Sequence, residues 1–240
     1  GYTFKGVAWY QGESNAHNAT TYARLLRLLQ ESWTQRFTQT AQATERVVAG
    51  LDSLTPQLRL QQLAFAKKHP FYLVQLSSIE RPSWPWFRET QRSLAQELHL
   101  PLIVTSDKGL RRDVHPPYKA EVGERLGRAV LRNDYGFAQS PLSPEVTSVL
   151  RAGSSVWLTL ATPMLLTTSD QQPMRTFEVA GADERFYPAV AEVTPAGQLV
   201  LSAEAVKLPR YVRYGWQPFS EGNVVSSQGL PLSTFRLEVK

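Results

Sequence analysis

An acid and an imidazole stand two positions apart at Asp113 and His115, directly before a pair of prolines, Pro116 and Pro117. Neither proline has a backbone N–H, and Pro116 disfavours the helical conformation for His115, so the sequence predicts a loop that holds the histidine extended. Residues 118–131 then carry apolar side chains at helical spacing. The histidine is therefore expected on a loop that leads into a helix, where α/β proteins often carry their chemistry.

A histidine in this position is suited to general-base catalysis. Imidazole changes its protonation state near neutral pH, and a carboxylate on its second nitrogen fixes the tautomer. An Asp-x-His pair also occurs where a loop histidine is satisfied by local hydrogen bonds alone. The pair by itself leaves both interpretations open, and other residues have to decide between them.

The composition indicates a globular protein. The chain has 240 residues, of which 42% are apolar, enough for the cores of one large or two modest domains. It has no cysteine, which excludes disulfides and thiolate ligands, and His17, His69 and His99 have no ligand spacing, so no metal or other cofactor is expected. No apolar run approaches the roughly 20 residues that span a bilayer, so no membrane partner is expected.

The net charge of +5 is spread along the chain, and no block of basic residues stands out. Nucleic-acid binding is typically indicated by a basic stripe with interleaved aromatic residues. The aromatic residues here fall in apolar, strand-like segments. Nucleic acid is therefore not expected as a partner.

Three apolar runs, residues 4–10, 71–76 and 100–105, predict buried strands. Helical patterns follow the first two, at residues 22–37 and 84–98. Strands that alternate with helices indicate a parallel sheet that is covered on both faces and binds ligands at the carboxyl ends of its strands. The polar loops that follow the strands are therefore expected to line one crevice.

The first of these strands is apolar enough to need a neighbour on each side, yet almost nothing precedes it that could pair with it. This favours the later portion of something longer. Residues 38–69 are polar at first and then helical in pattern, and their expected role is packing. The side chains expected to be buried there are those of Leu58, Leu60, Leu63, Ala64 and Phe65.

The pattern changes after residue 136 to short alternating runs, such as residues 155–160 and 175–179, broken by glycine and proline. Such runs are typical of antiparallel strands. We therefore expect two domains: an α/β domain over residues 1–136 and a β-rich, sandwich-like domain over residues 137–240.

Three motifs stand far apart in the chain: Trp9-Tyr10-Gln11-Gly12-Glu13-Ser14-Asn15-Ala16, Asp113-Val114-His115-Pro116 followed by residues 121–126, and residues 212–216 with 229–233. Together and in this order they resemble the sialate O-acetylesterase family of the SGNH hydrolases. The likeness weakens only around residues 38–70. It implies a three-layer α/β/α parallel sheet of the SGNH type, incomplete in this chain, followed by the mostly antiparallel domain.

The resemblance implies ester hydrolysis by a serine nucleophile, a histidine base and a carboxylate. His115 would be the base, and Asp113 would orient it, as in these esterases. The wider SGNH pattern places the acid three residues before the histidine, so Asp107 remains an alternative. Either carboxylate would serve if it met the second imidazole nitrogen.

The resemblance also implies an oxyanion site at Gln11, Gly12 and Asn15, with Gln11 preferred over Asn15 as the amide donor. Gly12 would let the backbone approach the substrate. A polar turn that caps the following helix is the alternative explanation of Ser14 and Asn15.

Three further residues are expected to bind substrate by the same resemblance. Glu13 lies in the first loop, and Trp84 and Arg88 lie in the second loop and the early helix. A sugar ring stacked on Trp84 is the functional interpretation, and core packing of that indole is the alternative.

The serine of the family lies in a Gly-Gln-Ser-Asn block, which does not occur in these 240 residues. Neither Ser14 nor Ser53 matches that block. We therefore expect the serine on a separate N-terminal chain or fragment of the same protein, and no ester turnover by this chain alone.

The expected function is a secreted or periplasmic carbohydrate O-acetylesterase. Its substrate would be O-acetylated sialic acid or an acetylated polysaccharide such as xylan or xyloglucan, and the sequence does not choose between them. The alternative is a non-catalytic carbohydrate-binding or scaffolding subunit, which the missing serine favours and the intact Asp113, His115 and Gln11 oppose.

Overall fold

The computed structural model describes residues 5–49, 70–138, 141–194 and 197–240. Its N-terminal part contains a parallel sheet with the strand order β1-β2-β3. These strands are β1 (Val7–Trp9), β2 (Phe71–Val74) and β3 (Leu102–Ile103). The three predicted strands and their parallel pairing are confirmed, although each strand is shorter than the apolar run that predicted it.

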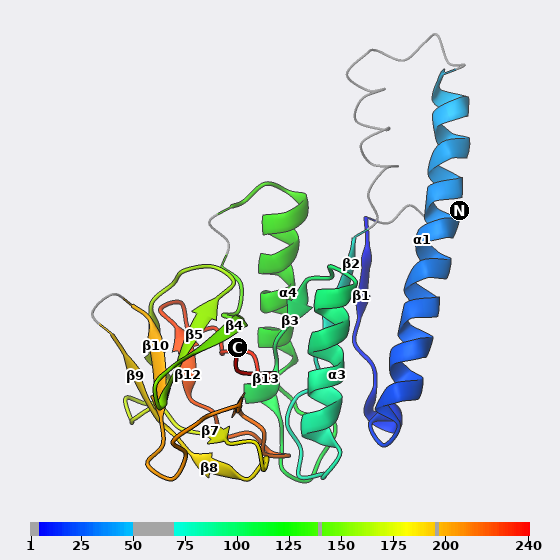
Figure 1. Cartoon of the computed structure of the whole chain (residues 1–240). Coiled ribbons are helices and arrows are strands. Elements are labelled where there is room, and N and C mark those ends of the chain that lie inside the picture. Colours follow the sequence, from blue (N-terminus) through cyan, green and yellow to red (C-terminus); the bar gives the residue numbers. More distant parts are fainter. Residues whose placement is uncertain (1–4, 50–69, 139–140, 195–196) are drawn as a thin grey trace.

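Helices cover both faces of this sheet. Phe71 and Leu73 of β2 pack in an apolar cluster with α1 (Ala19–Ala49) and α3 (Trp84–Glu97). Tyr72 and Val74 pack in a second cluster with α4 (Lys119–Asp134). Alternate residues of a strand point to opposite faces, so β2 contributes to two cores. Figure 1 shows α1 and α4 (Lys119–Asp134) on opposite sides of β1 and β2.

The first strand differs from the prediction. In the part of the chain that the structure describes, β1 pairs only with β2 and lies at the edge of the sheet. Its residues are half-buried, exposed and half-buried in turn. The prediction that this strand is buried is therefore wrong for the described part of the chain, in which one edge of β1 has no partner.

The first helix is longer than predicted. The apolar spacing indicated a helix over residues 22–37, whereas α1 runs to Ala49. The next residues predicted to pack in a core, 58, 60 and 63–65, lie outside the described residues.

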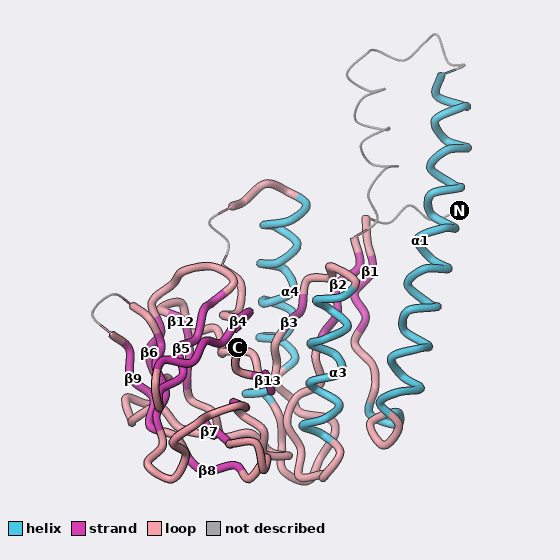
Figure 2. Tube along the Cα trace, in the orientation of Figure 1, coloured by secondary structure: helices cyan, strands magenta, loops and turns pink. Residues whose placement is uncertain are grey.

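The C-terminal part is built from antiparallel strands, as predicted. Two sheets have four strands each, in the orders β4-β5-β10-β9 and β13-β11-β7-β8, and β12 pairs with β6. Figure 2 shows strands and loops in this part of the molecule and helices around the parallel sheet. The strands are β4 (Val146–Ala152), β5 (Ser155–Leu160), β6 (Leu166–Thr168), β7 (Phe177–Ala180), β8 (Phe186–Pro188), β9 (Val190–Val193), β10 (Leu199–Ser202), β11 (Tyr211–Tyr214), β12 (Val224–Ser226) and β13 (Phe235–Glu238).

We call this C-terminal part, from β4 to the end of the chain, the β unit. Most of its buried apolar residues, from Val146 to Phe235, form one cluster that is separate from the two clusters around the parallel sheet. The polypeptide changes from helix to strand between the end of α4 at Asp134 and the start of β4 at Val146. The domain boundary at residue 137 stays a prediction.

Arg88 joins the β unit to the α/β part. Its side chain is fully buried in α3, and its guanidinium donates hydrogen bonds to the backbone oxygens of Gly215 (2.8 Å), Gln217 (2.7 Å) and Pro218 (2.9 Å). Burial lowers the pKa of this guanidinium to about 9, so the group is still a cation at neutral pH. Carbonyl dipoles of the β unit therefore replace the water that this charge loses on burial.

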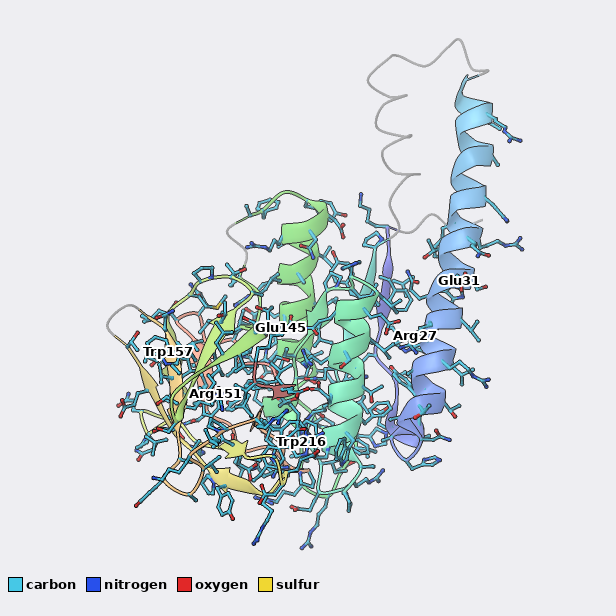
Figure 3. All side chains as sticks on the ribbon, in the orientation of Figure 1. Arg27, Glu31, Glu145, Arg151, Trp157 and Trp216 are labelled. Atoms are coloured by element: carbon cyan, nitrogen blue, oxygen red, sulfur yellow. The ribbon has the colours of Figure 1, made fainter. Side chains whose placement is uncertain are left out.

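We predict that Arg88→Ala lowers the free energy of unfolding by about 3 kcal/mol or more, because it removes a fully buried side chain and leaves the carbonyl oxygens of residues 215, 217 and 218 without this donor. Urea unfolding followed by tryptophan fluorescence measures the loss. Arg151→Ala is the matched control, since Arg151 on β4 is exposed (Figure 3) and its loss is expected to cost less than about 0.5 kcal/mol. Equal stability of the two variants would contradict the role of Arg88.

Candidate active site

The loop after β1 depends on a glycine. Gly12 has a φ of +148°, a conformation that favours glycine, and it precedes the short 3₁₀ helix η1 (Glu13–Asn15). A Cβ at this position would lie 2.5 Å from Cε1 of Phe87, whose ring is fully buried against Tyr22. The loop therefore turns at Gly12 in direct contact with the Phe87 ring of α3.

The polar side chains of this loop bind one another. The Gln11 amide donates to Asn15 Oδ1 at 2.7 Å, and the Gly12 N–H donates to Glu13 Oε2 at 3.0 Å. Gln11 thereby orients Asn15, and among the described residues the Asn15 amide nitrogen has no hydrogen-bond partner. Asn15 can thus present an amide N–H to a ligand, while Glu13 serves the loop itself.

Helix α1 takes its cap from a residue that the sequence analysis did not single out. Asn18 Oδ1 accepts the backbone N–H of Thr21 at 3.1 Å, which is the bond of a helix N-cap. Helix capping was the alternative explanation of Ser14 and Asn15. The signal was present in the sequence, because Asn18 directly precedes the first residue of α1 and asparagine is a preferred N-cap residue.

The loop after β3 carries Asp113 and His115. Asp113 Oδ1 accepts the backbone N–H of His115 at 2.8 Å and lies 3.4 Å from the imidazole Nδ1. The His115 side chain is 87% exposed. The carboxylate therefore sits on the Nδ1 side of the ring, and this leaves Nε2 accessible to a hydroxyl from outside the described part of the chain.

Asp107, the alternative acid, has another partner. Both of its carboxylate oxygens accept hydrogen bonds from the Arg125 guanidinium of α4, each at 2.6 Å. Such a bidentate pair fixes the carboxylate on the arginine. Asp113 is the carboxylate that the described structure places beside the His115 imidazole.

The base of the His115 loop is pinned to the loop after β2. Ser78 Oγ donates to the backbone oxygen of Ser106 at 2.6 Å, and the Glu80 N–H donates to the backbone oxygen of Arg111 at 2.9 Å. Gly109 lies between these bonds, so close to Ser78 that a Cβ would be 1.8 Å from the Ser78 oxygen. These contacts restrict the backbone that leads to Asp113 and His115.

The loops after β1 and β3 meet at the same end of the sheet, as predicted for parallel strands. Lys119, in the first turn of α4, lies with Nζ 3.4 Å from the Tyr10 hydroxyl and 4.8 Å from the centre of its ring. Val114 of one loop and Ala16 of the other pack in the same apolar cluster. In Figure 1, α1 and α3 both begin at the lower end of the sheet. The imidazole and the Asn15 amide thus lie at the same end of the sheet, where the strands have their carboxyl ends.

Two residues expected to bind substrate lie in the interior. Trp84 is only 2% exposed, and its indole N–H donates to the backbone oxygen of Ser77 at 2.6 Å. Arg88 is fully buried at the contact with the β unit. We therefore correct both expectations: neither side chain reaches solvent, and Trp84 follows its core-packing alternative.

The exposed tryptophan of this segment is Trp86, at 54%. The sequence contained a signal for this exchange. Residues 84, 87, 88 and 91 lie on one face of a helix at the spacing i, i+3, i+4 and i+7, and position 86 falls outside that face. Because α3 begins at Trp84, that residue falls on the buried face of the helix and Trp86 does not.

Among the described residues, no group of three or more acidic or histidine side chains gathers as metal ligands would. No described helix is long and apolar enough to cross a membrane.

No protein-family model and no curated protein matches the chain. A solved structure does: XAC1771, described as a novel carbohydrate acetylesterase from Xanthomonas citri, matches with a TM-score of 0.73 and 28% sequence identity. The match covers 97% of this chain and 50% of that protein. This supports a carbohydrate esterase relationship.

The likeness to the carbohydrate acetylesterase covers both the parallel sheet and the β unit, since it extends over nearly the whole chain. It supports the general expectation of a relationship to carbohydrate esterases. This chain spans about half the length of that protein, so the activity and partners of a complete enzyme are matters for proposal.

We predict that Gly12→Ala destabilises the chain by about 1 to 3 kcal/mol, because alanine at this φ is strained and its Cβ overlaps the Phe87 ring. Gly127→Ala in α4 is the control: nothing lies within 4 Å of its Cβ position, and alanine favours helix by up to about 1 kcal/mol. Urea unfolding of both variants tests this. A Gly12→Ala variant as stable as Gly127→Ala would show that the loop does not require glycine.

Proposed function

We propose that this chain is part of a carbohydrate O-acetylesterase of the SGNH type, exported to the periplasm or secreted. The substrate is O-acetylated sialic acid or an acetylated polysaccharide such as xylan or xyloglucan. The proposal is carried by one observation: His115, with Asp113 on its Nδ1 side, presents an exposed imidazole at the end of the sheet that also holds Gln11 and Asn15. The likeness to a carbohydrate acetylesterase supports it.

The proposed chemistry follows from these groups. A serine hydroxyl gives its proton to His115 Nε2 as its oxygen attacks the acetyl carbonyl carbon, and Asp113 stabilises the imidazolium that forms. The Asn15 amide, oriented by Gln11, donates to the developing oxyanion, a contribution of roughly 3 to 4 kcal/mol for one such donor. The sugar hydroxyl leaves with the proton of His115, and water then releases acetate by the same route.

We infer that the serine comes from an N-terminal chain or fragment of the same protein, because no Gly-Gln-Ser-Asn block occurs in these 240 residues. Ser14 is exposed in η1, and Ser53 lies outside the described residues. The high exposure of the His115 imidazole supports a second polypeptide that completes the site.

The free edge of β1 is the proposed docking place of that polypeptide. The Val7 N–H donates to the Pro70 oxygen on the β2 side, so the N–H and C=O of the next residue, Ala8, point to the open side. Ala8 is exposed, and a cavity of about 230 Å³ beside it is lined partly by Leu126 and Val130 of α4. An added strand would satisfy the backbone of Ala8, and the side chains beside that strand would fill the cavity.

We predict that His115→Ala in the reassembled protein lowers the rate of aryl acetate hydrolysis by roughly a thousandfold or more. Asp113→Asn should also lower kcat strongly, whereas Asp107→Asn should retain most activity because Asp107 is held by Arg125. Steady-state kinetics of the three variants measure this. Unchanged turnover by His115→Ala would refute the assignment of the base. A loss in Asp107→Asn but not in Asp113→Asn would show that Asp107 orients His115.

We predict that Ala8→Pro prevents assembly with the serine-bearing portion while this chain still folds. Proline removes the outward N–H but none of the bonds between β1 and β2. Ala8→Val keeps the N–H and should assemble normally. Size-exclusion chromatography of the mixed portions measures assembly, and circular dichroism checks the fold. Normal assembly of Ala8→Pro would place the partner elsewhere.

The missing serine favours one alternative, a non-catalytic carbohydrate-binding or scaffolding subunit. Intact-mass analysis of the purified protein distinguishes the two functions. A tightly bound second polypeptide with the serine block supports the esterase. The chain alone, with no ester hydrolysis, supports the binding subunit.

A further inference from the structure

The exposed indole of Trp86 is held in place by residues of the β unit. The Trp216 ring lies 5.2 Å away at an interplanar angle of 84°, and the Arg236 guanidinium lies 5.4 Å from the Trp86 ring centre. Arg236 is itself paired with Glu184. An aromatic side chain that is fixed yet 54% exposed loses little conformational freedom when a flat apolar ligand stacks on it.

Ring contacts and neighbours along the chain lead from Trp86 toward the candidate active site. Trp216 lies in the segment whose carbonyl groups bind Arg88, and Phe219 follows in the same segment. The Arg111 guanidinium lies 4.6 Å from the Phe219 ring centre, and Arg111 stands two residues before Asp113. We call this region the Trp86–Arg111 strip: the exposed side chains of Trp86, Arg111, Glu80 and Glu221, the half-buried Phe219, and the buried Trp216 that contacts Trp86.

The polar groups of the strip suit hydroxyl groups. Arg111 forms ion pairs with Glu80 (2.6 Å) and Glu221, and all three side chains are more than half exposed. Guanidinium and carboxylate groups offer paired donors and acceptors to neighbouring hydroxyls. Because Arg111 is paired with two carboxylates, the strip has no spare cation to hold an acidic sugar.

We propose that the Trp86–Arg111 strip binds a neutral, acetylated oligosaccharide, with one sugar ring stacked on Trp86 and another directed by Arg111 toward His115. This inference rests on the proposed esterase function and narrows its substrate. Trp216, Phe219 and Arg111 stand between the Trp86 indole and Asp113, so a ligand that contacts both ends is longer than a single sugar ring. A polysaccharide such as acetylated xylan fits this surface, whereas a single sialic acid does not.

Calorimetric titration with partially acetylated xylo-oligosaccharides tests the proposal, both on this chain and on the protein reassembled with its serine-bearing portion. Trp86→Ala should weaken binding about five- to tenfold, and Trp86→Tyr should recover most of the affinity. Trp157→Ala is the matched control, because Trp157 on β5 is 36% exposed and Figure 3 shows it well apart from Trp216. It should bind like the unaltered chain.

The kinetic form of the test separates this proposal from the proposed function. In the reassembled protein, Trp86→Ala should lower the ratio of kcat/KM for acetylated xylo-oligosaccharide to kcat/KM for aryl acetate about tenfold. If no form of the protein hydrolyses aryl acetate, the proposed esterase function is wrong. The titration then still shows whether the strip binds the oligosaccharide.

Four results would overturn the proposal. The first is an unchanged affinity of Trp86→Ala, and the second is an equal loss in Trp157→Ala. The third is tighter binding of O-acetylated sialic acid than of the oligosaccharide, or no binding of the oligosaccharide at all. The fourth is a Trp86→Ala variant that fails to assemble with the serine-bearing portion, since the strip would then be a protein contact.

Discussion

The fold depends on a buried cation that has backbone carbonyl groups as its partners. Arg88 is enclosed between α3 and the β unit, and its charge is stabilised by three carbonyl oxygens of residues 215–218. A buried charge without such partners would be strongly destabilising, so α3 and this segment have to fold against each other. The segment also carries Trp216 and leads to Phe219 and Glu221. One buried arginine therefore determines where the β unit meets the surface near the candidate active site.

The loop of His115 is held from two sides. Ser78 and Glu80, in the loop after β2, donate hydrogen bonds to its backbone. Glu221 of the β unit forms an ion pair with its Arg111 side chain. The histidine itself projects into solvent from this fixed base. A loop held in this way suits a histidine that accepts a proton from a hydroxyl of a second polypeptide. The imidazole would not need to move when that polypeptide completes the site.

The open edge of β1 and the exposed imidazole of His115 are two incomplete features of one sheet. The proposed second polypeptide would complete both, because it would pair with Ala8 and bring a nucleophile to the carboxyl ends of the strands. The likeness to a carbohydrate acetylesterase of twice the matched length is in keeping with that addition. In the proposed enzyme the β unit does more than pack on the α/β part, because its buried Trp216 contacts the exposed Trp86 ring and its Glu221 pairs with Arg111.

Local pattern in the sequence was sufficient for the alternation of parallel strands and helices, for the extended loop before Pro116 and for the antiparallel strands of the β unit, including residues 155–160. These features follow from side-chain period and from proline, which act over a few residues. Only the tertiary structure decided that Asp107 pairs with Arg125 and that, among the described residues, one edge of β1 has no partner strand. Each of these depends on which distant segment lies opposite a residue, and no local pattern contains that information.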